Sequence, residues 1–194
     1  MSTTSPAALS ASGLPSGLAG LAFAKGHGTG NDFVLVADPD GLRDYDAAEV
    51  AAVCNRHNGI GADGFIRAVR SEHLPEGQAL LQTNPDAEWF MDYRNGDGSI
   101  SEMCGNGVRV FAHYLTAHGL ETGRDFVVGS RAGGKPVQVH ATGPVFGEVT
   151  VDMGLVRQLG TSTATLDGRF YSGIGIDVGN PHLACVDPAL TESS

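Results

Sequence analysis

The spacing of apolar residues along the chain predicts two helices and several short strands. The first helix follows Asp46, which precedes Glu49 by three residues as in a capping box, and continues to about Arg56. A second helical pattern starts at Val108 and ends near Gly119, since glycine readily takes the left-handed conformation that ends many helices. Short apolar segments between Gly, Pro, Asn and Asp are typical of strands. We expect strands at residues 21–25, 33–37, 65–69, 80–82, 89–93, 126–128, 137–140, 148–153, 170–178 and 183–186.

Other segments lack a helical or strand period. Residues 71–78 are polar and predict a surface turn. The first 20 residues are mostly Ser, Ala, Gly, Pro and Leu, a composition that predicts a disordered tail. This tail lacks the basic start and long apolar centre of a signal peptide, and no stretch of the chain is long enough to span a membrane.

Composition narrows the class of protein. Apolar residues make up 41% of the chain, and 28 glycines among 194 residues favour tight turns and short strands over a helical bundle. The net charge of -10 opposes binding to nucleic acid or to an anionic membrane, because both need basic patches. Three cysteines without metal-ligand spacing predict neither a disulfide scaffold nor a zinc site. A reducing cytoplasm fits this cysteine usage best.

The segment with the strongest chemical signal surrounds Cys104, which precedes a Gly-Asn-Gly turn at the start of the second helix. Free backbone N–H groups and the positive end of a helix dipole favour a thiolate over a thiol, and the same N–H groups can hold a carboxylate. The pattern therefore favours acid–base or nucleophilic chemistry on a small carboxylic acid. The alternative is a small buried cysteine in a loop, as we expect for Cys54. Cys185 is expected to be a plain strand residue.

Two asparagines in glycine-rich turns are further candidates for ligand contacts. Asn31 ends the loop that starts at His27, and Asn95 starts the turn that leads into Cys104. Such loops bring backbone and short polar side chains close to a ligand. The alternative for both is a turn asparagine without a ligand, which is common.

Four glycine-rich motifs stand out along the chain. They are Lys25-Gly-His-Gly-Thr-Gly-Asn-Asp-Phe, Arg56-His-Asn-Gly-Ile-Gly-Ala-Asp-Gly, Arg94-Asn-Gly-Asp-Gly-Ser followed by Glu102-Met-Cys-Gly-Asn-Gly-Val-Arg, and Gly179-Asn-Pro-His. With these motifs the chain resembles the diaminopimelate epimerase family, over residues from about Phe23 to Asp187. One such motif would be weak evidence, but four in the family's order and spacing are highly specific.

The resemblance implies an isomerase of lysine and peptidoglycan precursor synthesis that inverts one stereocentre of LL-diaminopimelate to give the meso form, without any cofactor or metal. Two cysteines face the α-carbon from opposite sides, and Cys104 matches the first of them. One removes the proton and the other returns one. Gly105 and Asn106 match the residues whose backbone amides contact the substrate carboxylate.

The same resemblance implies roles for further residues. Asn31, Asn95 and Asn180 match substrate-binding asparagines, since an amide offers both a donor and an acceptor to an amino acid. His182 matches a histidine that helps to set the protonation of the cysteine pair, and its alternative is a capping or core histidine. Some family members bind substrate through a glutamine where this chain has Gly64, so that contact is not carried over.

The implied fold is α+β, with a mixed curved sheet wrapped around a central helix in each of two lobes. We expect a complete N-terminal lobe over residues 21–147 and the beginning of a C-terminal lobe over residues 148–194. The family's second catalytic cysteine falls beyond Ser194. We therefore expect that this polypeptide alone does not epimerise diaminopimelate, or that it is a fragment of a longer chain.

Three other functions stay open. One is another racemase or isomerase of the same superfamily, such as a proline racemase-like or a phenazine-type enzyme, although proline racemases usually carry histidine where this chain has Asn106. The second is a non-catalytic protein that keeps the amino-acid cradle without the second base. The third is a redox-sensing thiol at Cys104, which nothing else in the chain supports. The expected partner is a small-molecule substrate, with no nucleic acid or membrane, and the sequence leaves open whether two copies form a homodimer.

Overall fold

A computed structural model describes residues 20–178 and 181–187 in two compact units, and the chain passes from the first to the second after Asp152. The expected tail over residues 1–20 lies outside the described residues, apart from Gly20. Asn180 lies outside them as well.

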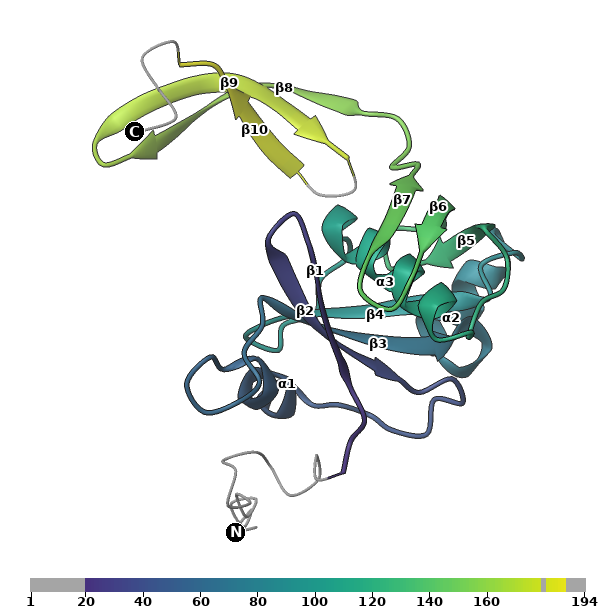
Figure 1. Ribbon diagram of the computed structural model, residues 1–194. Helices are drawn as coiled ribbons and strands as arrows, with labels where there is room; N and C mark the ends of the chain where they lie inside the picture. The colour runs from purple at the N-terminus through teal and green to yellow at the C-terminus, as the bar shows by residue number, and fades with distance from the viewer. Residues whose placement is uncertain (1–19, 179–180, 188–194) are drawn as a thin grey trace, which may run out of the picture. The chain divides into compact units, whose positions relative to one another are not determined.

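The first unit is built on one seven-stranded mixed sheet, in which the strands pair in chain order from β1 to β7 (Figure 1). Pairing is parallel between β2 and β3 and between β4 and β5, and antiparallel elsewhere in this sheet. The strands are β1 (Ala24–Gly28), β2 (Asn31–Ala37), β3 (Gly64–Arg70), β4 (Trp89–Asn95), β5 (Asp125–Gly129), β6 (Lys135–Thr142) and β7 (Gly147–Val151).

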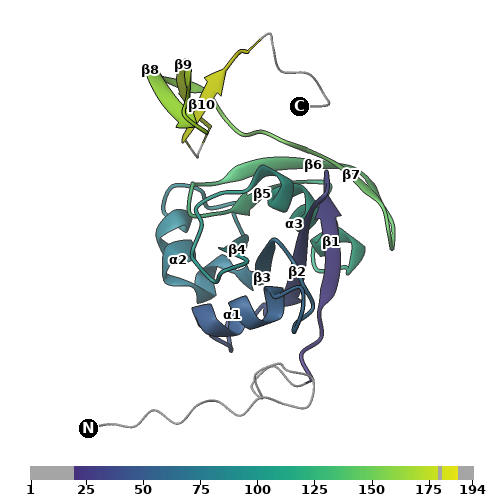
Figure 2. The same ribbon diagram turned by 90° about the vertical axis from the view of Figure 1, so that its left-hand side faces the viewer.

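The sheet curls around one central helix, α3 (Gly105–Ala117), as the family resemblance implied (Figure 2). This helix contacts β1 to β4, β6 and β7. Its apolar stripe is wholly buried, and every position that the helical spacing singled out belongs to it: Val108, Phe111, Ala112 and Leu115. The burial of this stripe against the curved sheet forms the core of the unit.

Two shorter helices, α1 (Ala47–Cys54) and α2 (Pro75–Leu81), cover the other face of the sheet (Figure 2). The capping box predicted for α1 is present, because Asp46 accepts from the backbone of Glu49 and the Glu49 side chain accepts from the backbone of Asp46. Cys54 ends α1 in a buried cluster with residues of β2 and β3, which confirms its expected place in the core. No helix within the described ranges is long and apolar enough to cross a membrane.

The prediction for residues 71–82 is wrong. A short 3-10 helix over Ser71–His73 and then α2 replace the expected surface turn and the strand at 80–82. Pro75 occupies the first turn of α2, where its missing N–H costs nothing, and the residues that follow are mostly good helix formers. Two leucines in a row gave a strand signal that helix propensity and the proline overrode.

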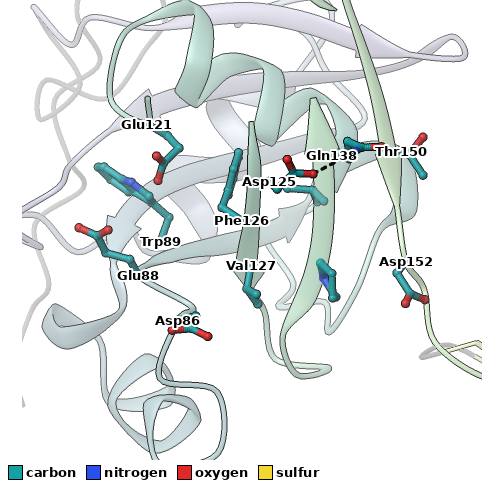
Figure 3. A pocket seen from close by; sticks show the side chains of 12 residues that line it. Asp86, Glu88, Trp89, Glu121, Asp125, Phe126, Val127, Gln138, Thr150 and Asp152 are labelled. Atoms are coloured by element: carbon teal, nitrogen blue, oxygen red, sulfur yellow. Dashed lines mark hydrogen bonds between the residues drawn. The ribbon is translucent and has the colours of Figure 1, made fainter. Parts of the chain in front are cut away.

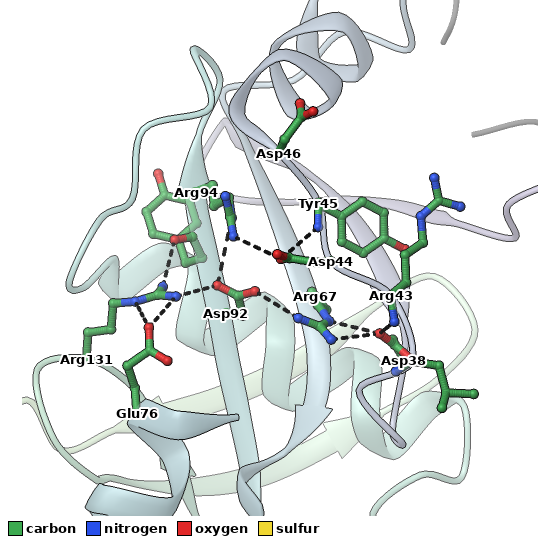
Figure 4. Close-up of polar contacts among 12 residues, drawn as sticks. Asp38, Arg43, Asp44, Tyr45, Asp46, Arg67, Glu76, Asp92, Arg94 and Arg131 are labelled. Atoms are coloured by element: carbon green, nitrogen blue, oxygen red, sulfur yellow. Dashed lines mark hydrogen bonds and ion pairs between the residues drawn. The ribbon is translucent and has the colours of Figure 1, made fainter. Parts of the chain in front are cut away.

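Charged side chains form a chain of ion pairs on one face of the sheet, and Arg67 and Asp92 at its centre are buried (Figure 4). Arg67 binds Asp38 at 2.9 Å and Asp92 at 3.5 Å, and Asp92 also accepts from Arg131 at 2.7 Å. Arg131 in turn lies 3.3 Å from Glu76 of α2. Alternating signs along this chain of ion pairs compensate the cost of removing each charge from water.

The second unit is a three-stranded antiparallel sheet in the order β10, β9, β8. Its strands are β8 (Arg157–Leu166), β9 (Arg169–Asp177) and β10 (Pro181–Cys185). The sequence predicted β9 and β10, including Cys185 as a strand residue, but missed β8. Its Thr and Ser residues alternate weakly with apolar ones, and all ten residues are exposed. Because β7 pairs with β6, it belongs to the first sheet, and the first unit ends at Asp152.

Candidate functional site

The β1–β2 turn is a two-residue hairpin loop, since Gly28 pairs with Asn31. Both loop residues, Thr29 (φ 54°) and Gly30 (φ 84°), have positive φ, as a type I′ turn requires. Glycine adopts this conformation freely, but a β-branched threonine there is strained. Gly28 brings the hairpin close to α3, because a β-carbon on it would lie 3.1 Å from the backbone oxygen of Asn106.

Cys104 is the N-cap of α3 and has an extended backbone. Its Sγ accepts from the backbone N–H of Gly107 at 3.4 Å, in the way that a serine or aspartate oxygen caps a helix. The sulfur therefore lies at the positive end of α3, as the sequence predicted for this cysteine.

Asn31, at the start of β2, meets Cys104 across the site. The distance from Sγ of Cys104 to Oδ1 of Asn31 is 3.5 Å, with the thiol as donor. The amide nitrogen of Asn31 donates to Oδ2 of Asp63 at 2.9 Å. The asparagine thus joins the first glycine-rich turn to the cysteine and to the loop that precedes β3.

The amides of Gly105 and Asn106 begin α3. Within the described part of the chain, neither backbone N–H has a hydrogen-bond acceptor, as expected for the first turn of a helix. The Asn106 side chain is already engaged, because Oδ1 accepts from Thr29 at 3.1 Å and from the Arg109 guanidinium. Arg109 also donates to the Thr29 hydroxyl at 2.7 Å. These contacts fix the hairpin to α3 and leave two N–H groups for an anion.

A group of four charged residues supports this corner of the sheet. Arg56 donates to Asp32 and to Asp63, each at 2.7 Å, while Lys25 lies 2.8 Å from Asp32 and donates to the backbone oxygen of Gly61. The Arg56 hydrogen bond is the main reason that the pKa of Asp32 lies far below its usual value. The Asn31 hydrogen bond is the largest cause that lowers the pKa of Asp63.

Asn95 ends β4, and both ends of its amide are engaged. Its Oδ1 accepts from the Tyr93 hydroxyl at 3.0 Å, and its Nδ2 donates to Oγ of Ser99 at 3.0 Å. Burial raises the pKa of Tyr93 to about 12. The Tyr93 hydroxyl and Ser99 together hold the Asn95 amide at the end of β4.

The remaining predicted site residues belong to the second unit. His182 lies on β10 of the second unit, opposite Ile176 of β9. Asn180 falls outside the described residues. Neither of the other cysteines resembles Cys104, because Cys54 is the last residue of α1 and Cys185 is an exposed residue of β10. Burial raises the pKa of Cys54 to about 11.

A pocket of about 650 Å³ lies elsewhere in the first unit (Figure 3). Trp89, which lines the pocket, starts β4, and Asn95 ends the same strand. At a rise of about 3.3 Å per residue, the two residues lie about 20 Å apart. The pocket is therefore distinct from the Cys104 site. It is lined by Asp86, Glu88, Trp89, Glu121, Asp125, Phe126, Val127, Pro136, Val137, Gln138, Thr150 and Asp152.

In the part of the chain that is described, no group of three or more His, Cys, Asp or Glu side chains could hold a metal ion.

Several residues around Cys104 were not candidates from sequence: Thr29, Arg56, Asp63, Tyr93 and Arg109. All of these except Tyr93 lie within the motifs that carry the family resemblance, but the resemblance gave none of them a role. Their contacts depend on how β1, β3 and α3 pack together.

The chain is similar in sequence to proteins of one known family. The sequence profile of the family described as "Diaminopimelate epimerase" matches residues 23–159. A protein named "Diaminopimelate epimerase" from Rhodococcus jostii (strain RHA1) is 63% identical over 176 residues, covering 89% of this chain and 61% of that protein. One of the same name from Mycolicibacterium gilvum (strain PYR-GCK) is 53% identical over 180 residues, covering 88% and 60%. The chain thus spans about three-fifths of the length of these relatives.

Among solved structures, one match is titled "Crystal structure of the Bacillus anthracis phenazine biosynthesis protein, PhzF family". It has 17% sequence identity and a TM-score of 0.46, and covers 79% of this chain and 53% of that chain.

Proposed function

Because the chain belongs to the diaminopimelate epimerase family, we propose that it binds diaminopimelate and supplies one acid–base group for inversion of an α-carbon from the LL to the meso configuration. One observation carries this proposal. Sγ of Cys104 lies at the first turn of α3, between the Gly107 N–H at 3.4 Å and Oδ1 of Asn31 at 3.5 Å. A thiol in this place can exchange a proton with a substrate carbon whose carboxylate is held by the same turn.

The proposed chemistry follows from the weak acidity of an amino-acid α-proton. A base must be held close to that proton, and the negative charge that develops as it leaves must be stabilised on the carboxylate. Cys104 is the proposed base or acid, and the backbone N–H groups of Gly105 and Asn106 are the proposed carboxylate contacts. Asn31 and Asn95 are proposed to contact the substrate's polar groups. We extend the same proposal to Asn180 and His182 from the matched motif.

Inversion needs a second group on the opposite face of the α-carbon, because one thiol alone returns the proton to the face from which it came. Neither Cys54 nor Cys185 starts a helix as Cys104 does. This observation favours a second candidate function, in which the 194-residue chain binds diaminopimelate without turning it over. The two functions share the same cradle and differ in whether a second base is supplied.

Calorimetry with meso-diaminopimelate on the 194-residue chain tests the proposed ligand, with L-proline and L-lysine as comparison ligands. We expect heat of binding with diaminopimelate, and a much weaker signal with proline. A folded chain that binds proline better than diaminopimelate contradicts the proposed substrate and favours a related racemase. In parallel, LL-diaminopimelate is assayed for inversion; turnover at an ordinary enzymic rate by this chain alone contradicts the need for a separate second base.

A further inference from the structure

Several hydrogen bonds hold the Asp63 side chain near the Cys104 site, although the proposed function gives Asp63 no role. Its Oδ2 accepts from the Asn31 amide at 2.9 Å and from the backbone N–H of Asp32 at 3.1 Å. Its Oδ1 accepts from Arg56 at 2.7 Å. Its own backbone N–H is bound by Asp32 at 3.0 Å. The carboxylate is therefore held in one place by neighbours from β2 and from the loop after α1.

The chemistry of these contacts decides how the Asn31 amide is oriented. An ionised carboxylate can only accept hydrogen bonds, so the end of the amide that faces Asp63 must be the donor, Nδ2. The lowered pKa of Asp63 keeps it ionised near neutral pH. Since the amide is planar, its other end, Oδ1, then points to the sulfur of Cys104, where it lies at 3.5 Å.

We propose that Asp63, held by Arg56, is a positioning residue that fixes the Asn31 amide so that its oxygen, and not its nitrogen, faces the Cys104 thiol. The purpose of this arrangement rests on the proposed function, in which Cys104 exchanges a proton with the substrate. The contact itself does not depend on that function and can be measured in the isolated chain.

The orientation matters because the two ends of the amide have opposite effects on the sulfur. Oδ1 accepts from the S–H group and so stabilises the thiol, whereas Nδ2 would donate to the sulfur and stabilise the thiolate. The Gly107 N–H and the start of α3 act in the second direction. Other charged or titratable groups around this corner are Lys25, Asp32 and Arg56 beside Asp63, Tyr93 on β4 and Arg109 on α3.

Alkylation by iodoacetamide as a function of pH reads out the state of this sulfur. A Cys185→Ser background removes the exposed cysteine of β10, and Cys54 is buried, so that Cys104 is the thiol that reacts in the folded chain. Failure of Cys54 to react then reports, in every sample, that the first unit remains folded.

Four variants in this background test the proposal: Asp63→Ala, Asn31→Ala, the double variant, and Glu102→Gln. Without Asp63, the amide can turn its nitrogen to the sulfur, and we expect alkylation at neutral pH to rise on the order of three- to tenfold, with the pH profile displaced to lower pH. Glu102→Gln removes an equal charge two residues from Cys104. Glu102 is exposed and makes no hydrogen bond or ion pair with the described residues, so we expect a change of less than about twofold.

The double variant distinguishes an effect of Asp63 that acts through Asn31 from a direct effect of the Asp63 charge on Cys104. If Asp63 acts through Asn31, adding Asp63→Ala to Asn31→Ala changes alkylation no more than Glu102→Gln does. The proposal is overturned if Asp63→Ala matches Glu102→Gln, or if its effect persists in full without Asn31. Calorimetry with meso-diaminopimelate on the same samples is independent: coupling without ligand binding keeps the positioning role and removes the proposed substrate.

Discussion

Arg67 on β3 and Asp92 on β4 pair across the sheet with Nη1 3.5 Å from Oδ2, and the two residues are only 4% and 2% exposed. Asp92 also accepts from Arg131 at 2.7 Å. Asp92→Asn leaves the guanidiniums of Arg67 and Arg131 without their shared counter-charge, and we expect it to lower the free energy of unfolding by about 3 kcal/mol or more. Urea unfolding followed by circular dichroism measures this change.

The control for that measurement is Glu72→Gln, because the Glu72 side chain is 71% exposed. Its removal is expected to change the free energy of unfolding by no more than about 0.5 kcal/mol. A cost below about 1 kcal/mol for Asp92→Asn, which is the range of an ordinary surface pair, would show that these ion pairs contribute little.

Stability is expected to fall in acid because of Asp32 and Asp63, whose pKa values are both lowered in the folded chain. The unfolded chain, with aspartate pKa values of about 3.9, takes up protons at a higher pH than the folded chain. The contribution of these carboxylates is therefore complete above about pH 5 and is lost as the pH falls through the unfolded-state value toward the folded one. Urea unfolding between pH 6 and pH 2.5 should show a shallower decline for Asp32→Asn than for the unchanged chain. An identical decline in both would assign acid sensitivity to other groups.

Two conservative variants of Thr29 are expected to differ in stability, because only one of them keeps the hydroxyl that accepts from Arg109. Thr29→Val keeps the shape but removes the hydroxyl that accepts from Arg109, and should cost about 1 kcal/mol, or roughly 2–4 °C in melting temperature. Thr29→Ser keeps the hydroxyl and should melt within about 1 °C of the unchanged chain. Equal melting temperatures for the two variants would mean that the hydroxyl contact does not hold the hairpin to α3.

Cys104→Ser should separate the cap of α3 from its proposed chemistry. Serine is a preferred N-cap and can accept from the Gly107 N–H, so stability is expected to be unchanged, whereas Cys104→Ala should cost about 1 kcal/mol. Both variants should lose the reactive thiol. Calorimetry should still detect meso-diaminopimelate with Cys104→Ser, because the proposed carboxylate contacts are backbone amides. Loss of binding in this variant would place the sulfur itself among the ligand contacts.

The parts of the fold that the sequence predicts well are those with a strong local signal. Asp46 and Glu49 form the expected capping box, and the apolar stripe from Val108 to Leu115 forms the expected central helix. Residues 71–82 and β8 were predicted poorly, because neither carries a regular apolar period. In the first case a proline and short-range helix propensity decide the structure, and in the second the strand exists through pairing with β9.

The candidate site divides in the same way. Cys104, Gly105 and Asn106 are consecutive, so their place at the start of α3 could be predicted from the sequence alone. The partners of Asn31 could not, because Asp63 reaches it only when β2 and β3 pair in parallel. Tyr93 and Arg109 likewise act through contacts between separate elements.

The contact between Asn31 and Cys104 joins residues 73 positions apart in the chain. Closing a loop of that length costs conformational entropy, which is recovered only when β2, β3 and α3 have docked together. During refolding, the hydrogen bond from the Gly107 N–H to Cys104 can form as soon as α3 does, whereas the contact with the Asn31 amide oxygen forms later. Pulsed alkylation of Cys104 during refolding therefore measures when the sheet assembles around its central helix.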